Sequence, residues 1–133
     1  MSNRLDDVAF MNGLKLRPSR PVIYIAGKMR GLEDYGRAHF EAAEKMLTAL
    51  GFIVLNPATL PIGMADHKYL PICMAMLEAA DCVLLLNNWA DSKGATAEYH
   101  YAICQGKAII YEDAGPEERT KDGSEETKAG DGA

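Results

Sequence analysis

Residues 81–111 read DCVLLLNNWADSKGATAEYHYAICQGKAIIY, and this stretch decides the expected fold. The run CVLLL at 82–86 is short, continuous and apolar, which is typical of a buried strand. After the loop NNWADSKG, alanines and aromatic residues at helical spacing predict a helix over 95–105 that ends at Gly106. The run AIIY at 108–111 predicts a further strand. A strand, a helix and a strand in this order indicate a parallel sheet.

The same alternation extends toward the N-terminus. VIYIA at 22–26 predicts a buried strand, and apolar residues at steps of three and four predict a helix that starts near Gly36 and ends at Gly51. FIVL at 52–55 predicts the next strand. After a long loop over 57–67 we expect a helix from about Tyr69 to Ala80, with Pro71 acceptable only in its first turn.

These elements predict an α/β fold, a Rossmann-like (flavodoxin-like) open parallel sheet of about four to five strands flanked by helices on both faces. We expect this domain to span residues 21–112. Residues 1–20 have no clean hydrophobic period and predict a loosely ordered arm, with a short helix near Leu5 to Met11. Residues 113–133 contain almost no apolar side chains, which predicts a disordered acidic tail.

Composition bounds the function classes. The 133-residue chain is long enough for one domain with a real core. No apolar run approaches the ~18 residues that a membrane-spanning helix needs, and the start of the chain lacks the order of a secretory signal. We therefore expect a cytoplasmic protein with no membrane partner.

Cys73, Cys82 and Cys104 show no CxxC or zinc-type spacing, which favours small buried thiols.

The net charge of −5 is unevenly placed. From Glu112 onward there are eight acidic and three basic residues, so residues 1–111 are neutral. A neutral body with an acidic end argues against a nucleic-acid partner, because such binding is driven by neutralising phosphates.

Two loops follow strands at the edge where open parallel sheets bind ligands, the carboxyl end of the strands. The first, GKMRG at 27–31, offers glycine N–H groups together with Lys28 and Arg30, a combination suited to an anion such as phosphate. A basic turn in solvent is the alternative interpretation. The second loop is NNWADSKGA at 87–95.

Glu98 is the acidic residue that the second loop delivers into a helix. Ser92, Gly94 and Glu98 lie within two helical turns, and the alanines between them leave room for a ligand. We expect Glu98 in the first turn, near the positive end of the helix, where it would stay ionised and nucleophilic in a partly dry pocket. The alternative is a capping-type glutamate that only stabilises the helix start.

Together, YIAGKMRG at 24–31 and DSKGATAE at 91–98 resemble the nucleoside 2-deoxyribosyltransferase-like superfamily. The pattern is most similar to a small branch in phage and bacterial proteins that reads YIAGPM.G near its start and W..SKGA.AE near its end. The resemblance covers roughly residues 22–111 and leaves the arm and the tail unexplained.

The resemblance implies cleavage or transfer of the N-glycosidic bond of a deoxynucleoside or its 5′-monophosphate. In that superfamily a glutamate attacks the sugar C1′, and Glu98 matches it; Tyr24 matches a tyrosine that hydrogen-bonds this glutamate. Ser92 matches a serine of the monophosphate N-hydrolases, where the transferases carry an aspartate. Phosphate is therefore favoured over a free nucleoside, because a hydroxyl can donate to phosphate and a carboxylate would repel it. The phosphate and substrate site would comprise Gly27, Lys28, Met29, Arg30, Gly31, Ser92 and Gly94.

Other positions carry weaker expectations. Trp89 would stack on the base or form a plain hydrophobic lip. His100 follows Glu98 by two residues, about 200° round the helix, and so faces elsewhere. His39 and His67 have no ligand partners at metal spacing. The resemblance implies no metal and no organic cofactor, and it implies a homodimer or higher homo-oligomer.

Cys73 departs from the superfamily pattern. The family places an aspartate there, eight residues before the position of Asp81, to assist departure of the base. A thiol cannot supply a carboxylate's charge at neutral pH. Asp66 would be a substitute, and Asp81 itself, which opens a strand, is expected to be structural.

Three functions therefore stay open. The first is a 2′-deoxynucleotide N-glycosidase or deoxyribosyltransferase with a glutamate nucleophile. The second is a catalytically impaired protein of the same fold that binds, senses or sequesters a nucleotide. The third is a ribonucleotide phosphoribohydrolase of the kind that uses PGGxGTxxE, although SKGATAE lacks the double glycine.

Overall fold

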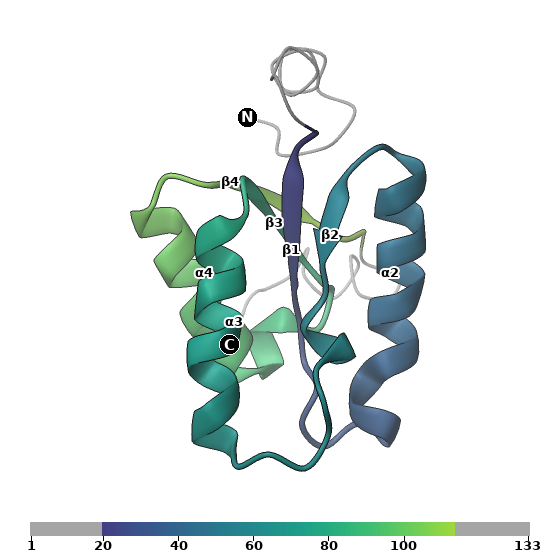
Figure 1. Cartoon of the computed structure of the whole chain (residues 1–133), viewed down its shortest axis with the longest axis vertical. Coiled ribbons are helices and arrows are strands. Elements are labelled where there is room, and N and C mark those ends of the chain that lie inside the picture. The colour runs from purple at the N-terminus through teal and green to yellow at the C-terminus, as the bar shows by residue number, and fades with distance from the viewer. Residues whose placement is uncertain (1–19, 114–133) are drawn as a thin grey trace, which may run out of the picture.

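The computed structural model describes residues 20–113 of the chain. Within them, four parallel strands form one open sheet in the order β2-β1-β3-β4 (Figure 1). The strands are β1 (Val22–Ala26), β2 (Ile53–Leu55), β3 (Cys82–Leu85) and β4 (Ala108–Tyr111). The predicted α/β, Rossmann-like class is confirmed. Expectations for residues 1–19 and 114–133, which include the short helix near Leu5 to Met11 and nearly all of the acidic tail, lie outside the described residues.

Within residues 20–113, three α-helices cover the sheet. Helix α2 (Arg37–Ala49) lies on one face, and α3 (Asp66–Ala79) and α4 (Lys93–Cys104) lie on the other (Figure 1). Short 3-10 turns join these elements at η1 (Glu33–Gly36), η2 (Pro57–Thr59) and η3 (Trp89–Asp91). Helices on both faces explain why the central strands β1 and β3 are wholly apolar, because a strand covered on both sides has almost no solvent-facing positions.

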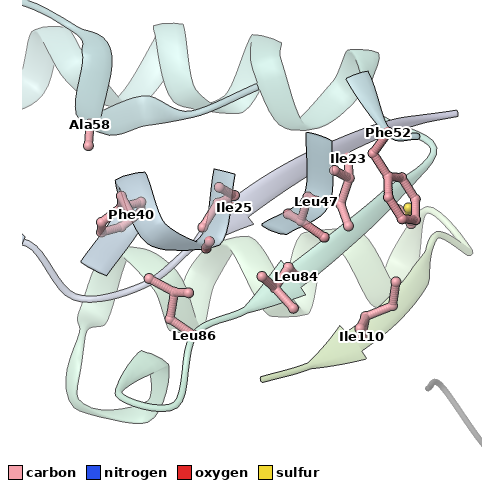
Figure 2. Packing of buried hydrophobic residues seen from close by; sticks show 11 residues of the cluster. Ile23, Ile25, Phe40, Leu47, Phe52, Ala58, Leu84, Leu86 and Ile110 are labelled. Atoms are coloured by element: carbon pink, nitrogen blue, oxygen red, sulfur yellow. The ribbon is translucent and has the colours of Figure 1, made fainter. Parts of the chain in front are cut away.

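Alternate residues of β1 divide the core in two. Ile23 and Ile25 join Phe40 and Leu47 of α2 in a cluster whose members are all apolar or sulfur-bearing (Figure 2). Their neighbours on the strand, Tyr24 and Ala26, join the cluster under α3 and α4. The period of two along a strand therefore sends a phenol, together with the smallest side chain of β1, to the face with two helices.

The strand order fixes where a ligand can bind. From β1 the chain passes through α2 to β2 on one side, and from β2 it crosses through α3 to β3 on the other side of β1. The loops that leave β1 and β3 therefore diverge toward opposite faces. This point of divergence, at the carboxyl ends of the strands, is the crevice in which open α/β sheets bind ligands.

Two helices begin earlier than the sequence predicts. Helix α3 starts at Asp66, so that Pro71 is its sixth residue and the expectation of a first-turn proline is wrong. The extra turn is fastened to the preceding loop by Tyr69, whose hydroxyl donates to the Pro61 carbonyl at 2.6 Å and accepts from the Met64 N–H at 3.2 Å. These two bonds tie the first turn of α3 to the loop, but they do not replace the backbone bond that a proline cannot make.

Helix α4 starts at Lys93 because Ser92 caps it. The Ser92 hydroxyl oxygen accepts from the Ala95 N–H at 3.1 Å, which satisfies one of the unpaired donors at the helix start. Glu98 is consequently the sixth helical residue, and the expectation that it lies in the first turn is wrong. It also cannot be the capping glutamate of the alternative interpretation, because capping boxes use the third helical position.

Candidate functional site

The two loops that the sequence marked lie side by side. The Lys28 N–H in the loop after β1 donates to the Asn88 side-chain oxygen in the loop after β3 at 3.0 Å. Two residues earlier in each segment, the Leu86 N–H donates to the carbonyl of Ala26, the last residue of β1, at 2.8 Å. These bonds hold the two loops together at the carboxyl edge of the sheet.

Gly27 permits this close approach. A Cβ atom placed on Gly27 would lie 2.6 Å from Cδ1 of Leu86 and 2.9 Å from its Cβ, distances too short for any side chain. The glycine that ends β1 is therefore required by packing, because only a residue without a Cβ lets the two strand ends meet here.

A buried phenol–carboxyl pair forms the floor of the site. The Tyr24 hydroxyl of β1 donates to Glu98 Oε2 of α4 at 2.7 Å, across 74 residues of sequence. Tyr24 is fully buried and Glu98 is 8% exposed. Glu98 and Asn56 are the two polar residues that the core holds among residues 20–113. A carboxyl with so little contact with water is costly unless it is paired or protonated.

Burial also sets the proton affinity of the pair. It raises the pKa of the Glu98 carboxyl to about 7, against a smaller lowering by the hydrogen bond from Tyr24. It raises the pKa of Tyr24 well above its usual value, with Glu98 adding to the effect. Near pH 7, Glu98 is thus divided between its acid and its carboxylate forms, whereas the sequence led us to expect a fully ionised group.

A cavity of about 470 Å³ opens over this pair. Its volume falls within the range of small-molecule sites. Nine of the residues that the sequence marked line it: Tyr24, Gly27, Met29, Arg30, Asp66, Cys73, Ser92, Gly94 and Glu98. Lys28, Gly31 and Trp89 are not among the lining residues. The Trp89 ring instead packs on Tyr99, with ring centroids 4.8 Å apart.

One face of α3 forms a wall of the cavity. Asp66, Tyr69, Leu70 and Cys73 all line it, at steps of three and four along the helix. The inner end of this face is Cys73, whose thiol contacts Tyr24 and whose pKa burial raises. The outer end is Asp66, which pairs with Arg30 of the loop after β1; both side chains are largely exposed. The cavity thus has a buried end with titratable groups and a charged mouth.

Sequence reasoning missed several lining residues. Arg37, the first residue of α2, lines the cavity and donates to the Ala58 carbonyl at 2.9 Å. Its position was a usable signal, because helices that follow parallel strands begin at the carboxyl edge of the sheet. The loop after β2 supplies an apolar wall of Pro57, Leu60, Pro61, Ile62 and Met64. No charge or motif in that loop pointed to it.

Ser92 retains a donor for a ligand. Its hydroxyl oxygen accepts the Ala95 N–H as the helix cap, and this leaves the hydroxyl proton available to an acceptor in the cavity that Ser92 lines. Asp81, by contrast, accepts from the Val22 N–H at 2.8 Å at the opposite end of the sheet, in keeping with the structural role expected of it.

The described residues can also be searched for metal-binding groups and for membrane-spanning helices. Across residues 20–113, no group of three or more His, Cys, Asp or Glu side chains is arranged to hold a metal ion. His39 pairs instead with Glu112, its Nε2 lying 2.8 Å from Oε1. No helix in this part of the chain has the length and apolarity needed to span a bilayer.

Comparison with known families gives one match. Residues 21–111 match the family model described as "Domain of unknown function (DUF4406)". Because the match covers more than half of the chain, the protein belongs to this family. Its bounds coincide with the sheet and its helices, from the residue before β1 to the last residue of β4. No curated protein matches the chain.

Proposed function

We propose that the protein is an N-glycosidase of 2′-deoxynucleoside 5′-monophosphates, in which Glu98 attacks the sugar C1′ and Tyr24 orients it. The observation that carries the proposal is the buried pair, with the Tyr24 hydroxyl 2.7 Å from Glu98 Oε2, at the floor of a cavity of about 470 Å³. The resemblance to the nucleoside 2-deoxyribosyltransferase-like superfamily at YIAGKMRG and SKGATAE supports the same assignment.

In this mechanism Tyr24 does two things for the nucleophile. Its hydrogen bond fixes Oε2, so that Oε1 is the oxygen without a Tyr24 contact and the one assigned to attack. The same bond lowers the pKa of Glu98 against the effect of burial, which keeps part of the population ionised near pH 7. Since only the carboxylate attacks, kcat/KM should rise with pH through about 7.

The mouth of the cavity supports binding of a 5′-phosphate. Arg30 brings a cation and Ser92 a hydroxyl donor, and Gly27 lines the same cavity. Charge-assisted hydrogen bonds from such groups to phosphate oxygens are the strong kind. Met29 and Gly94 complete this side of the wall. No cofactor is required by the chemistry.

One observation favours the second candidate, a nucleotide-binding protein without turnover. Cys73, in the place of the superfamily's aspartate, contacts Tyr24 beside Glu98. A thiol there gives a departing base less help than a carboxylic acid would. The resemblance also implies a homo-oligomer under either function, which light scattering at working concentration tests.

The deciding experiment compares wild type with Glu98→Gln on a panel of 2′-deoxynucleoside and ribonucleoside 5′-monophosphates, with chromatographic detection of free base. We expect Glu98→Gln to lose at least about 1,000-fold in turnover, as when other nucleophiles are removed, while calorimetry shows nucleotide binding retained. Glu112→Gln is the matched control, since Glu112 is half-buried at the same edge of the sheet and outside the cavity lining. Turnover retained in Glu98→Gln would rule out the nucleophile, and release of base from ribonucleotides alone would favour the phosphoribohydrolase.

A further inference from the structure

The cavity contains few groups that could give a proton to a departing base. Its lining, within the described part of the chain, includes two carboxyl groups, Glu98 and Asp66, and no histidine. In the proposed function Glu98 is the nucleophile. It must have lost its proton before it attacks, so it cannot donate that proton in the same step.

Asp66 lies too far from the reacting end to replace it. Seven residues separate Asp66 from Cys73 on one helix face, which corresponds to about 10 Å at the α-helical rise. Asp66 is also paired with Arg30 at the exposed mouth. A general acid has to reach its acceptor at hydrogen-bond distance or through one water, and Asp66 meets neither condition for a group held over Glu98.

The hydroxyl and thiol groups of Tyr24, Cys73 and Tyr69, which line the cavity, are weak acids. The Tyr24 proton is already donated to Glu98, and burial raises the pKa of both Tyr24 and Cys73. The Tyr69 hydroxyl donates to the Pro61 carbonyl. None of these three groups holds a proton that it would release readily to a base nitrogen at neutral pH.

The apolar wall from the loop after β2 adds no side-chain donor. Pro57, Leu60, Pro61, Ile62 and Met64 line it, and none of these side chains carries a hydrogen-bond donor. A base lying against this wall is held by apolar contact. The wall therefore cannot stabilise a base that departs as an anion, since an unpaired charge against apolar side chains is costly.

We infer that the preferred substrates are 2′-deoxynucleoside 5′-monophosphates whose base leaves without being protonated, with N7-alkylated purines as the chemical class. The inference rests on the proposed function and names the substrates of that same site. An N7-alkylated purine carries a positive charge in the nucleotide and departs as a neutral molecule. An ordinary purine departs as an anion unless a proton is supplied.

The balance of the two half-reactions is simple. A bond forms between C1′ and a carboxylate oxygen of Glu98 as the bond from C1′ to N9 breaks, and the electron pair of the broken bond goes to the base and cancels its positive charge. Water then attacks C1′, the carboxylate leaves, and the extra proton of the water passes to solvent. The products are 2-deoxyribose 5-phosphate, the neutral base and one proton.

The test measures release of base from N7-methyl-2′-deoxyguanosine 5′-monophosphate and from 2′-deoxyguanosine 5′-monophosphate by wild type. The rate with Glu98→Gln is subtracted as background, because N7-alkylated nucleotides also lose their base spontaneously. We expect kcat/KM to be at least about 100-fold higher for the alkylated nucleotide, the lower end of what a missing general acid is worth. Cys73→Asp should lower this ratio of kcat/KM values at least about tenfold, because the new carboxyl group should raise kcat/KM for 2′-deoxyguanosine 5′-monophosphate. In Cys73→Asn the new side chain has the size of aspartate but no acidic proton, so this variant should keep the wild-type ratio.

The outcomes separate the two claims. Equal kcat/KM for both nucleotides, each above background, would overturn the substrate inference and leave the glycosidase proposal standing. Release above background from neither nucleotide would overturn the glycosidase proposal, and the inference with it. If Cys73→Asp does not fold, the wild-type ratio alone decides.

Discussion

Ile23 and Ile25 point toward α2, while Tyr24 and Ala26 on the same strand point toward α3 and α4. The cluster under α2 contains aliphatic, aromatic and sulfur-bearing side chains and no titratable group other than the Cys82 thiol (Figure 2). The opposite cluster contains the Tyr24 phenol and abuts the buried Glu98 carboxyl. One face of the sheet is thus packed with apolar side chains, whereas the other gives up part of its stability to bury a phenol and a carboxyl group.

Asn56 shows what a buried polar group looks like when it serves structure. Its side chain donates to Glu44 Oε1 at 2.8 Å and accepts from the Ala58 N–H at 2.8 Å, so both ends of the amide are used. Glu98 has its hydrogen bond from Tyr24 on one oxygen and faces a cavity. The difference is that Asn56 completes a turn, whereas Glu98 leaves one carboxyl oxygen without a Tyr24 contact in the lining of the cavity.

The largest effect should come from the α2 face. Phe40→Ala removes a fully buried ring and should lower the free energy of unfolding by about 3–5 kcal/mol. Met46→Ala on the same helix is the control; its side chain is 47% exposed, and the change should stay within about 0.5 kcal/mol. Urea denaturation measures both variants. A loss below 1 kcal/mol for Phe40→Ala would break the contrast between the faces.

The next effect has the opposite sign: on the face with α3 and α4, replacing Glu98 should raise the free energy of unfolding relative to wild type as the pH increases. The pKa of Glu98 is about 7 in the native state and near 4.5 when unfolded, so the native state binds more protons between these values. Stability from this group is therefore full below pH 4.5 and declines as pH rises to about 7, by about 3 kcal/mol in total. Glu98→Gln has no such titration.

We accordingly expect Glu98→Gln to gain about 3 kcal/mol relative to wild type between pH 4 and pH 8. Denaturation at both pH values gives this difference directly and cancels the titration of all other groups. If the free energy of unfolding changes with pH equally in the two proteins across this range, burial does not raise the pKa of Glu98.

Tyr24→Phe should lower the free energy of unfolding by a smaller amount. The variant removes the donor to the buried carboxylate and should cost about 2 kcal/mol at pH 8, where Glu98 is ionised. The pKa of Glu98 should rise further, because the Tyr24 bond is what lowers it. Denaturation and carboxyl carbon NMR measure the two effects. Tyr101→Phe, which loses an exposed bond to Glu78, should cost less than about 1 kcal/mol; an equal loss in both variants would contradict the assignment.

The smallest effect concerns the mouth of the cavity. Arg30→Ala should weaken binding of a 2′-deoxynucleoside 5′-monophosphate about tenfold, or 1.4 kcal/mol, because Arg30 lines the cavity and its charge is shared with Asp66. The same variant should leave the affinity for the unphosphorylated nucleoside unchanged. Lys28→Ala is the matched control, since Lys28 is not among the lining residues. Calorimetry that finds equal losses for the two variants would place the phosphate elsewhere.

The strands could be predicted because their signals are local. Each is a short apolar run bounded by glycine, proline or a polar loop, and the predicted ranges agree with β1 and β4 and exceed β2 and β3 by one residue each. The helix starts were predicted less well, because competing local signals had to be weighed. For α4 the Ser92 cap outweighed the small residues that follow it, and for α3 the bonds of Tyr69 outweighed the penalty of Pro71.

The site was predictable only in part for a physical reason. The period of two places Tyr24 on one face of β1, but nothing local says which residue, 74 positions later, will meet it. Resemblance to a family supplied that pairing. The apolar wall at 57–64 gave no signal at all, because apolar loop residues look the same whether they line a cavity or cover a core.

Pro71 divides α3 between the two ends of the cavity. It has no N–H, so the His67 carbonyl lacks its helical donor, and the first turn of α3 is joined to the rest of the helix by one backbone bond fewer. Asp66 lies in that turn and Cys73 lies beyond the proline. Amide protons before Pro71 should therefore exchange with solvent faster than those after it. The entrance of the cavity can therefore open locally while Tyr24 and Glu98 at its floor keep their hydrogen bond.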